Sequence, residues 1–234
     1  MADQSTKGRT LHEQAEIARE KEQDFLKALQ LIDEATVAYI NDKDYLGASE
    51  AQASRFITLN YLFDQTSDQA YSLLAMSSAK VAIEMAEASR IKEAIALPYF
   101  NLAKAYEDRG EYTQAVPLYQ KAWDAITTNP PATHNRPAVR ADILAHKSFS
   151  EYMAGDKSAI ERLKGAIEEL KNADEPQYTK DVWLSGAYMR MAKALGRGNP
   201  ETTTYLDLAK AVIDKNPELK LRLGQWEKLA KELV

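Results

Sequence analysis

The stretch that decides the fold runs from Ala96 to Asn129 and reads ALPYFNLAKAYEDRGEYTQAVPLYQKAWDAITTN. Within it, aromatic, small and apolar residues recur at steps of three or four residues, and a glycine separates two such runs. This spacing predicts two amphipathic helices joined by a tight turn. The residues that set the pattern are Tyr99, Leu102, Ala103, Tyr106, Gly110, Ala115, Tyr119 and Ala122.

The second half of this pattern recurs along the chain every 43 to 44 residues. The positions equivalent to Ala115, Tyr119 and Ala122 are Ser72, Met76 and Ala79, then Ala159, Leu163 and Ala166, and finally Leu206 and Ala209. A chain that repeats one helical hairpin is most simply a stack of hairpins, each of which buries its apolar face against the next. The sequence therefore predicts a binding scaffold.

Composition agrees with an all-α protein. The chain has 234 residues, 45% of them hydrophobic and 28% charged, with only 9 glycines and 8 prolines. This length and apolar content can bury a sizeable core, and the scarcity of helix breakers favours helices throughout. We expect a flexible N-terminus over residues 1–10 and a single helical-repeat domain over residues 11–234.

Capping residues and prolines place ten helices. Asn199-Pro200 and Asn216-Pro217 each set a good N-cap residue before a proline at the first helical position, and Asp44 is a further N-cap candidate. The second to ninth helices pair into four hairpins, which leaves one helix to cap each end. The predicted ranges are 11–41, 44–64, 67–89, 92–108, 112–127, 137–153, 156–172, 177–195, 200–214 and 217–233.

The two end helices each carry one apolar stripe. Terminal repeats need such a cover because they would otherwise expose an apolar face. The same stripes could alternatively form a homodimer contact or bind a partner. The stripe residues are Ala15, Ala18, Phe25, Ala28, Leu29 and Ile32 in the first helix, and Leu219, Leu223, Trp226, Leu229, Ala230 and Leu233 in the last.

The residues of the 96–129 stretch resemble the tetratricopeptide repeat (TPR), whose signature is W-x-x-L-G-x-x-Y followed by A-x-x-x-F and a proline. Small residues at Ala103 and Ala115 would let the two helices approach closely. The proline is missing at Thr127, and the period exceeds the family's 34 residues. The chain is therefore similar to the longer-helix members found in kinesin light chains and bacterial regulatory proteins, and the resemblance implies a right-handed α-solenoid.

Several functional classes lack their sequence signatures. The chain contains no cysteine, so no thiolate metal site or cysteine nucleophile is available. No metalloprotease, phosphate-loop, nucleophile-elbow or calcium-loop motif occurs, and His12, His134 and His146 lie far apart in the sequence. We therefore predict no enzyme activity, no metal site and no cofactor.

Charge and hydropathy bear on partners and location. The net charge is −5, from 30 basic and 35 acidic residues, and no basic cluster stands out, so no nucleic-acid partner is expected. No signal peptide and no apolar run long enough to cross a membrane is evident. We expect a cytoplasmic protein with no membrane partner.

The TPR resemblance implies a ligand groove lined by the first helix of each hairpin. Aromatic anchors there would supply burial, while Asn101, Lys104 and His146 would orient a peptide or partner helix. A carboxylate clamp is not predicted, because the next repeat offers Asp142 and His146 where further cations would be needed. The predicted groove residues are Thr58, Tyr61, Phe100, Asn101, Lys104, His146, Phe149, Tyr152 and Tyr188.

The residues leave two alternatives open. Phe100, Phe149 and Tyr188 could instead belong to the core of the stack, displaced by a small error of register. The sequence predicts a noncatalytic scaffold or adaptor that binds a peptide or a protein segment. The alternative function is a regulatory sensor that holds a small molecule between hairpins, in a closed pocket around Tyr61, Phe100 and Tyr152.

Overall fold

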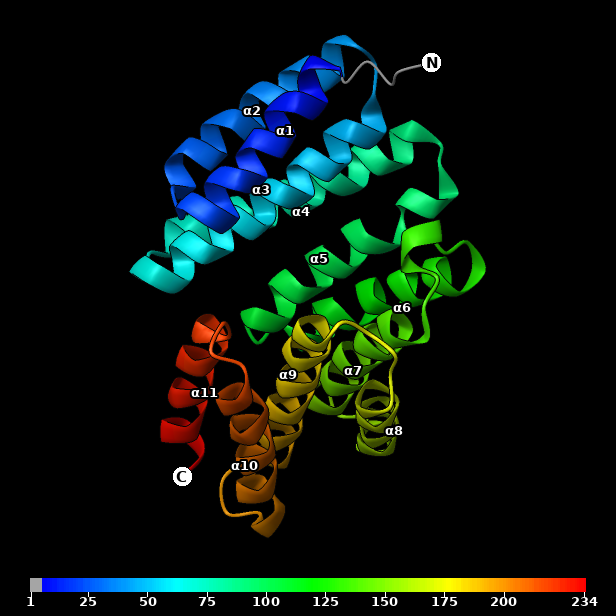
Figure 1. Ribbon diagram of the computed structural model, residues 1–234. Helices are drawn as coiled ribbons and strands as arrows, with labels where there is room; N and C mark the ends of the chain where they lie inside the picture. Colours follow the sequence, from blue (N-terminus) through cyan, green and yellow to red (C-terminus); the bar gives the residue numbers. More distant parts are fainter. Residues whose placement is uncertain (1–5) are drawn as a thin grey trace. The chain divides into compact units, whose positions relative to one another are not determined.

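The computed structural model describes residues 6–234, and every regular element in that range is helical (Figure 1). Three short elements join the α-helices: a π-helical turn at Ala18–Glu22 and 3-10 turns at Lys92–Ala94 and Ala132–His134. The α-helices are α1 (Lys7–Ile17), α2 (Phe25–Asn41), α3 (Tyr45–Thr66), α4 (Gln69–Ser89), α5 (Ala96–Asp108), α6 (Tyr112–Thr128), α7 (Pro137–Met153), α8 (Ala159–Lys171), α9 (Gln177–Leu195), α10 (Pro200–Lys215) and α11 (Lys220–Leu233). The predicted all-α repeat fold is confirmed.

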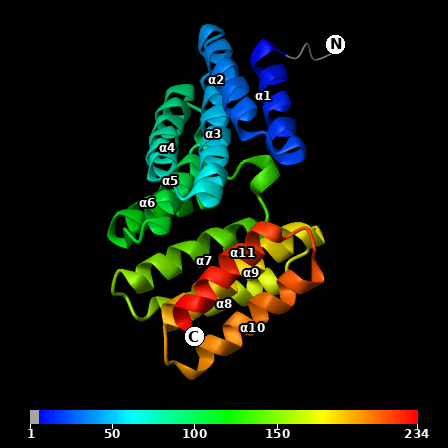
Figure 2. The ribbon, with the colours of Figure 1, turned by 90° about the vertical axis from the view of Figure 1, so that its left-hand side faces the viewer.

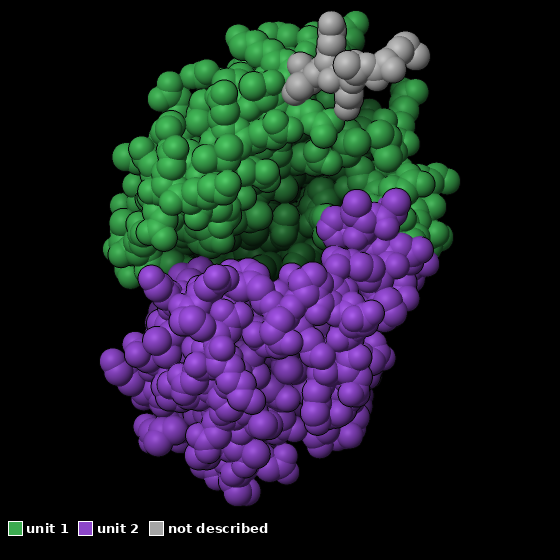
Figure 3. Space-filling view, viewed as in Figure 1, with its two compact units in different colours: residues 1–111, 128–131 green, residues 112–127, 132–234 purple. Residues whose placement is uncertain are grey.

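The chain divides into two compact units (Figure 3). Unit 1 comprises residues 1–111 and 128–131, and unit 2 comprises residues 112–127 and 132–234. The division falls within the stretch that decides the fold, because α5 lies in unit 1 and most of α6 in unit 2. The single domain over residues 11–234 therefore stays a prediction.

Unit 1 is a series of neighbouring antiparallel helices. Each helix from α1 to α4 packs against the helix that follows it in the chain, so the series ends with α5 packed on α4 (Figure 2). Small residues at the helix contacts, such as Ala15, Ala35, Ala48 and Ala51, are completely buried and let the helices approach closely. Ile32 fills the space between them.

The predicted first helix over residues 11–41 is wrong, because the chain folds back within it. A π-helical turn ends α1, Gln23 takes a left-handed conformation with φ of 56°, and Asp24 caps α2 by accepting a hydrogen bond from the Lys27 backbone N–H (3.0 Å). No glycine or proline marks the reversal. The N-terminal cap is therefore a complete hairpin, α1 and α2, instead of one helix.

The N-terminal residues are helical earlier than the sequence suggested. Thr6 accepts a hydrogen bond from the Arg9 backbone N–H, and α1 begins at Lys7. Of the predicted flexible segment 1–10, residues 1–5 lie outside the described part of the chain, while residues 7–10 form the first turn of α1.

Unit 2 contains the hairpins α7/α8 and α9/α10, as predicted. Alanines, Leu163, Leu170 and Met191 form most of its fully buried core. The last helix, α11, packs on α9 and α10, and the indole Nε1–H of Trp226 donates to the Leu206 carbonyl (2.9 Å). The predicted C-terminal capping helix is therefore confirmed; a dimer contact through the end helices stays a prediction.

Two of the predicted N-caps are present. Asn199 accepts a hydrogen bond from the Glu201 backbone N–H (2.9 Å) ahead of Pro200, and Asp44 accepts one from the Gly47 backbone N–H (2.9 Å). Each side-chain oxygen pairs one of the backbone donors that the first turn of a helix leaves without a partner. The Asp44 cap also fixes the start of α3, which forms one wall of a pocket in unit 1.

Candidate functional site

Four of the nine predicted groove residues are buried: Thr58, His146, Phe149 and Tyr188. Thr58 donates its hydroxyl to the Ser54 carbonyl of the same helix (2.9 Å). Phe149 and Tyr188 belong to the core of unit 2, with the Phe149 ring 5.6 Å from that of Tyr112 in an edge-to-face contact. For Phe149 and Tyr188, the alternative interpretation as core residues of the stack therefore fits the structure better than the interpretation as groove residues.

The other five predicted groove residues are half-buried: Tyr61, Phe100, Asn101, Lys104 and Tyr152. The ring centroid of Tyr61 lies 5.6 Å from that of Phe25, Lys104 pairs with Asp108 (3.0 Å), and the Lys157 ammonium lies 4.0 Å from the centroid of Tyr152. Tyr152 lies in unit 2 and the other four in unit 1. One continuous groove through all nine positions stays a prediction.

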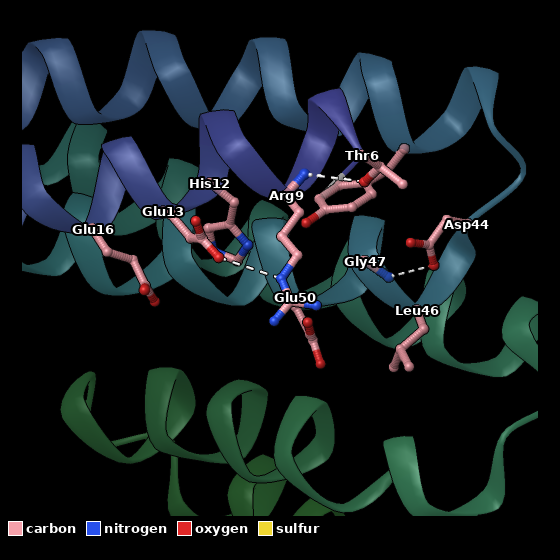
Figure 4. A pocket seen from close by; sticks show the side chains of 10 residues that line it. Thr6, Arg9, His12, Glu13, Glu16, Asp44, Leu46, Gly47 and Glu50 are labelled. Carbon is pink, nitrogen blue, oxygen red and sulfur yellow. Dashed lines mark hydrogen bonds and ion pairs between the residues drawn. The ribbon is translucent and has the colours of Figure 1, made fainter. Parts of the chain in front are cut away.

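A pocket that the sequence analysis missed lies within unit 1, between α1, the end of α2 and the start of α3 (Figure 4). Its volume is about 500 Å³, within the range of roughly 300–1,000 Å³ that is typical of small-molecule sites. Most of its lining is polar. The lining residues are Thr6, Arg9, His12, Glu13, Glu16, Tyr39, Asp44, Leu46, Gly47 and Glu50.

Tyr39 holds the three helices of the pocket together. A Cβ atom on Gly8 of α1 would lie 2.7 Å from the Tyr39 ring, and one on Gly47 of α3 would lie 2.4 Å from it. Only glycine can approach an aromatic ring so closely. Tyr39 is accordingly 5% exposed, and its ring is fixed between α1 and α3.

The pocket carries an excess of negative charge. Among the described residues, its lining has one arginine, Arg9, and four acidic residues: Glu13, Glu16, Asp44 and Glu50. The Arg9 guanidinium pairs with Glu13 (Nε to Oε1, 3.3 Å). The cation that pairs with Glu16 is Arg19, at 4.0 Å, and no cation within residues 6–234 forms an ion pair with Glu50.

The ionisable groups of the pocket respond to this environment. Burial and the neighbouring Asp44 raise the pKa of the Glu50 carboxyl, although Arg9 opposes the shift. Burial, together with Glu50 and Asp44, raises the pKa of the Tyr39 hydroxyl to about 12. Burial lowers the pKa of His12. At neutral pH the site therefore holds a protonated tyrosine and a neutral histidine.

Two polar groups of the pocket have no partner among the described residues. Tyr39 forms no side-chain hydrogen bond, and the Nε2 atom of His12 is buried without one. Buried polar groups are almost always hydrogen-bonded, so the buried Nε2 atom of His12 points to an unfilled binding capacity. The sequence signal for this pocket was weak, because its residues come from positions 6 to 50 and share no motif.

Neither a metal-ligand cluster nor a membrane-spanning helix occurs within residues 6–234. No group of three or more histidine, aspartate or glutamate side chains there could hold a metal ion. None of the described helices is long and apolar enough to cross a lipid bilayer.

The fold belongs to the class of TPR-like helical repeats, and comparison with solved structures shows this directly. A kinesin-light-chain-like protein of Podospora anserina, with nearly identical TPR-like repeats, superposes with a TM-score of 0.57 at 12% identity, over 97% of this chain and 98% of that one. A variant form of the same protein gives a TM-score of 0.59 at 14% identity, over 90% and 96% of the two chains.

BtubC (BKLC) of P. vanneervenii also has this fold, with a TM-score of 0.59 at 18% identity, over 89% of this chain and 78% of that one. At these identities the shared feature is the fold. No family model matches the sequence, and no curated protein matches it. The resemblance to tetratricopeptide repeats that the 96–129 stretch indicated is confirmed.

Proposed function

We propose that this chain is a noncatalytic, cytoplasmic scaffold or adaptor that binds a peptide or a segment of a partner protein. The observation that carries the proposal is the likeness of about nine tenths of the chain to TPR-like repeat proteins, a fold that commonly serves protein interaction. Stacked hairpins suit this role because their helices present long rows of side chains at fixed spacing.

The half-buried members of the predicted groove are the best candidates for partner contact. Tyr61, Phe100 and Tyr152 are each only half-buried, so they can bury further surface on binding. Asn101 and Lys104 supply an amide and an ammonium that can pair with backbone carbonyls or a carboxylate. Of the buried positions, Phe149 and Tyr188 belong to the core cluster against which Tyr152 packs.

Photo-crosslinking from single positions tests this proposal. A photoreactive phenylalanine analogue would replace Phe100, Lys104 or Tyr152, and the same analogue at the exposed Lys80 on α4 would serve as the control. We expect one protein from the native lysate to crosslink at the groove positions and not at position 80. The purified partner should then bind Lys104→Ala more weakly than wild type, with Lys80→Ala unchanged.

The proposal fails if the groove positions and position 80 crosslink the same set of proteins, or if Lys104→Ala together with Asn101→Ala leaves the affinity for the purified partner unchanged. Phe149→Ala is unsuitable for this test because that side chain is 2% exposed and belongs to the core. Its loss would reduce stability by cavity formation, whatever the role of the groove.

A second candidate is the regulatory sensor that binds a small molecule between hairpins. The observation that favours it is the pocket of about 500 Å³ between α1, α2 and α3. A sensor ligand would raise the unfolding temperature because it binds the folded state in preference to the unfolded state. A thermal-shift screen of metabolites distinguishes the two functions, since a scaffold of peptide segments would show no such response.

A further inference from the structure

The charge of the pocket in unit 1 selects the kind of ligand that it can hold. Four carboxylates face one arginine, which is already paired with Glu13. An anion would be repelled, and a neutral apolar group would leave the carboxylates desolvated without compensation. A ligand with a positive charge would instead lower the electrostatic energy of Glu50, which has no ion-pair partner among the described residues, and of Glu16, whose pairing with Arg19 is long at 4.0 Å.

The hydroxyl of Tyr39 adds an acceptor to this set. The side chain is 95% buried, since only 5% of its surface is exposed, yet its oxygen has no hydrogen-bond partner among residues 6–234. Tyr39 lines the pocket together with Asp44 and Glu50, whose charges add to the effect of burial in raising the pKa of its hydroxyl. A ligand N–H could donate to it, and the ring is too tightly held by Gly8 and Gly47 to turn away.

We propose that this pocket binds an organic cation, an alkylammonium or a guanidinium group, with Glu16 and Glu50 accepting its N–H donors and Tyr39 providing a further oxygen. The group comes either from a lysine or arginine side chain of a peptide or from a free polyamine. Both have several N–H donors and a slender chain that fits a cavity of about 500 Å³. The site is separate from the nine predicted groove positions, and the proposal rests on the second candidate function, which places a small-molecule ligand in this same pocket.

The experiment is a calorimetric titration of the whole chain with two probes. One probe is spermidine, and the other is an acetylated, amidated tetralysine peptide; an acetylated tetraglutamate serves as the negative control. We expect saturable binding of a cationic probe that weakens with added salt. In an amide-resolved NMR titration, the largest shifts should include Gly47, whose N–H lies in the pocket wall.

Matched variants separate the pocket from general surface charge. Glu16→Gln with Glu50→Gln removes two pocket carboxylates, and Glu34→Gln with Glu84→Gln removes two carboxylates of α2 and α4 that lie outside the pocket; all four are exposed. The first pair should weaken binding about tenfold, as expected for lost charge-assisted hydrogen bonds, and the second should leave it unchanged. Tyr39→Phe keeps the ring between the glycines and should weaken binding by a smaller factor.

Each outcome decides the proposal. Binding of spermidine alone supports a free polyamine as the source, and binding of tetralysine alone supports a peptide side chain. Absence of binding of both probes at millimolar concentration, or an equal loss of affinity in the two double variants, overturns the cation site. A negative result here would leave the groove proposal intact, because the crosslinking positions on α5 and α7 lie outside the pocket.

Discussion

The Oη atom of Tyr119 on α6 lies 3.1 Å from Nδ1 of His146 on α7, and the two side chains are 0% and 4% exposed. The hydrogen bond joins neighbouring helices inside unit 2. Asp142, one turn before His146 on the same helix, has its Oδ1 4.0 Å from the other ring nitrogen. His146 therefore contributes to the interior of the stack, where its polar atoms have partners within the protein.

Loss of this hydrogen bond should reduce stability measurably. Tyr119→Phe removes one partner from a buried pair, so we expect the free energy of unfolding to fall by about 1–2 kcal/mol. Urea denaturation followed by circular dichroism measures it. Tyr178→Phe, the same change at a half-exposed tyrosine of α9, should stay within roughly 0.5 kcal/mol of wild type. Equal effects of the two substitutions would show that the buried bond contributes nothing specific.

Two glycines in helices should respond to alanine with opposite signs. Gly47→Ala places a Cβ 2.4 Å from the Tyr39 ring, so we expect a loss of about 1–3 kcal/mol from overpacking. At Gly165 of α8, an added Cβ would meet no atom within 4 Å, so alanine should raise stability by about 0.5–1 kcal/mol through helix propensity. Thermal unfolding of both variants measures the difference. A Gly47→Ala variant as stable as wild type would contradict the close packing of Tyr39 on this glycine.

The reversal between α1 and α2 depends on a helix cap. Asp24→Ala removes the acceptor of the Lys27 backbone N–H, and we expect a loss of about 1 kcal/mol. Asp24→Ser retains a side-chain oxygen that can cap the helix and should recover most of that loss. Chemical denaturation of the two variants tests the assignment. If the serine variant were no more stable than the alanine variant, the Asp24 side chain would not act as the N-cap of α2.

Stability should fall as the solution becomes acidic, in part because of His12. Burial, the largest cause, holds the pKa of His12 below 6.5 in the folded state, whereas the unfolded chain has the ordinary value. As the pH drops below about 6.5, the unfolded state takes up a proton first, so the free energy of unfolding decreases until the pH reaches the folded pKa.

The pH effect can be isolated by substitution. His12→Gln removes this titration, so it should lose less stability than wild type between about pH 7.5 and pH 5.5, as measured by urea unfolding. His134, whose pKa burial also lowers, remains in both proteins and contributes equally. Identical losses in the two proteins would place the acid sensitivity elsewhere in the chain.

Much of the fold could be predicted because its signals are local. The hairpins α7/α8 and α9/α10, the cap at Asn199 and the final helix follow from the spacing of small and apolar residues and from proline positions. The reversal of the chain at Gln23 could not be predicted. Its left-handed conformation belongs to a residue that is not glycine, so no residue type signals the turn, and the packing of α1 on α2 holds it in place.

The sequence by itself determined that this protein is a stack of helical hairpins. Both the helical spacing of apolar residues and the repeat of 43 to 44 residues can be found from the order of the amino acids alone. Only the tertiary structure decided which of those side chains are available to a ligand. Lys104 and His146, both predicted to line the groove, differ in burial. The acidic pocket forms only once α1 turns back, which brings Glu16 of α1 and Glu50 of α3 into the lining of one cavity. Burial and charge proximity arise from packing between distant segments, which a local pattern does not encode.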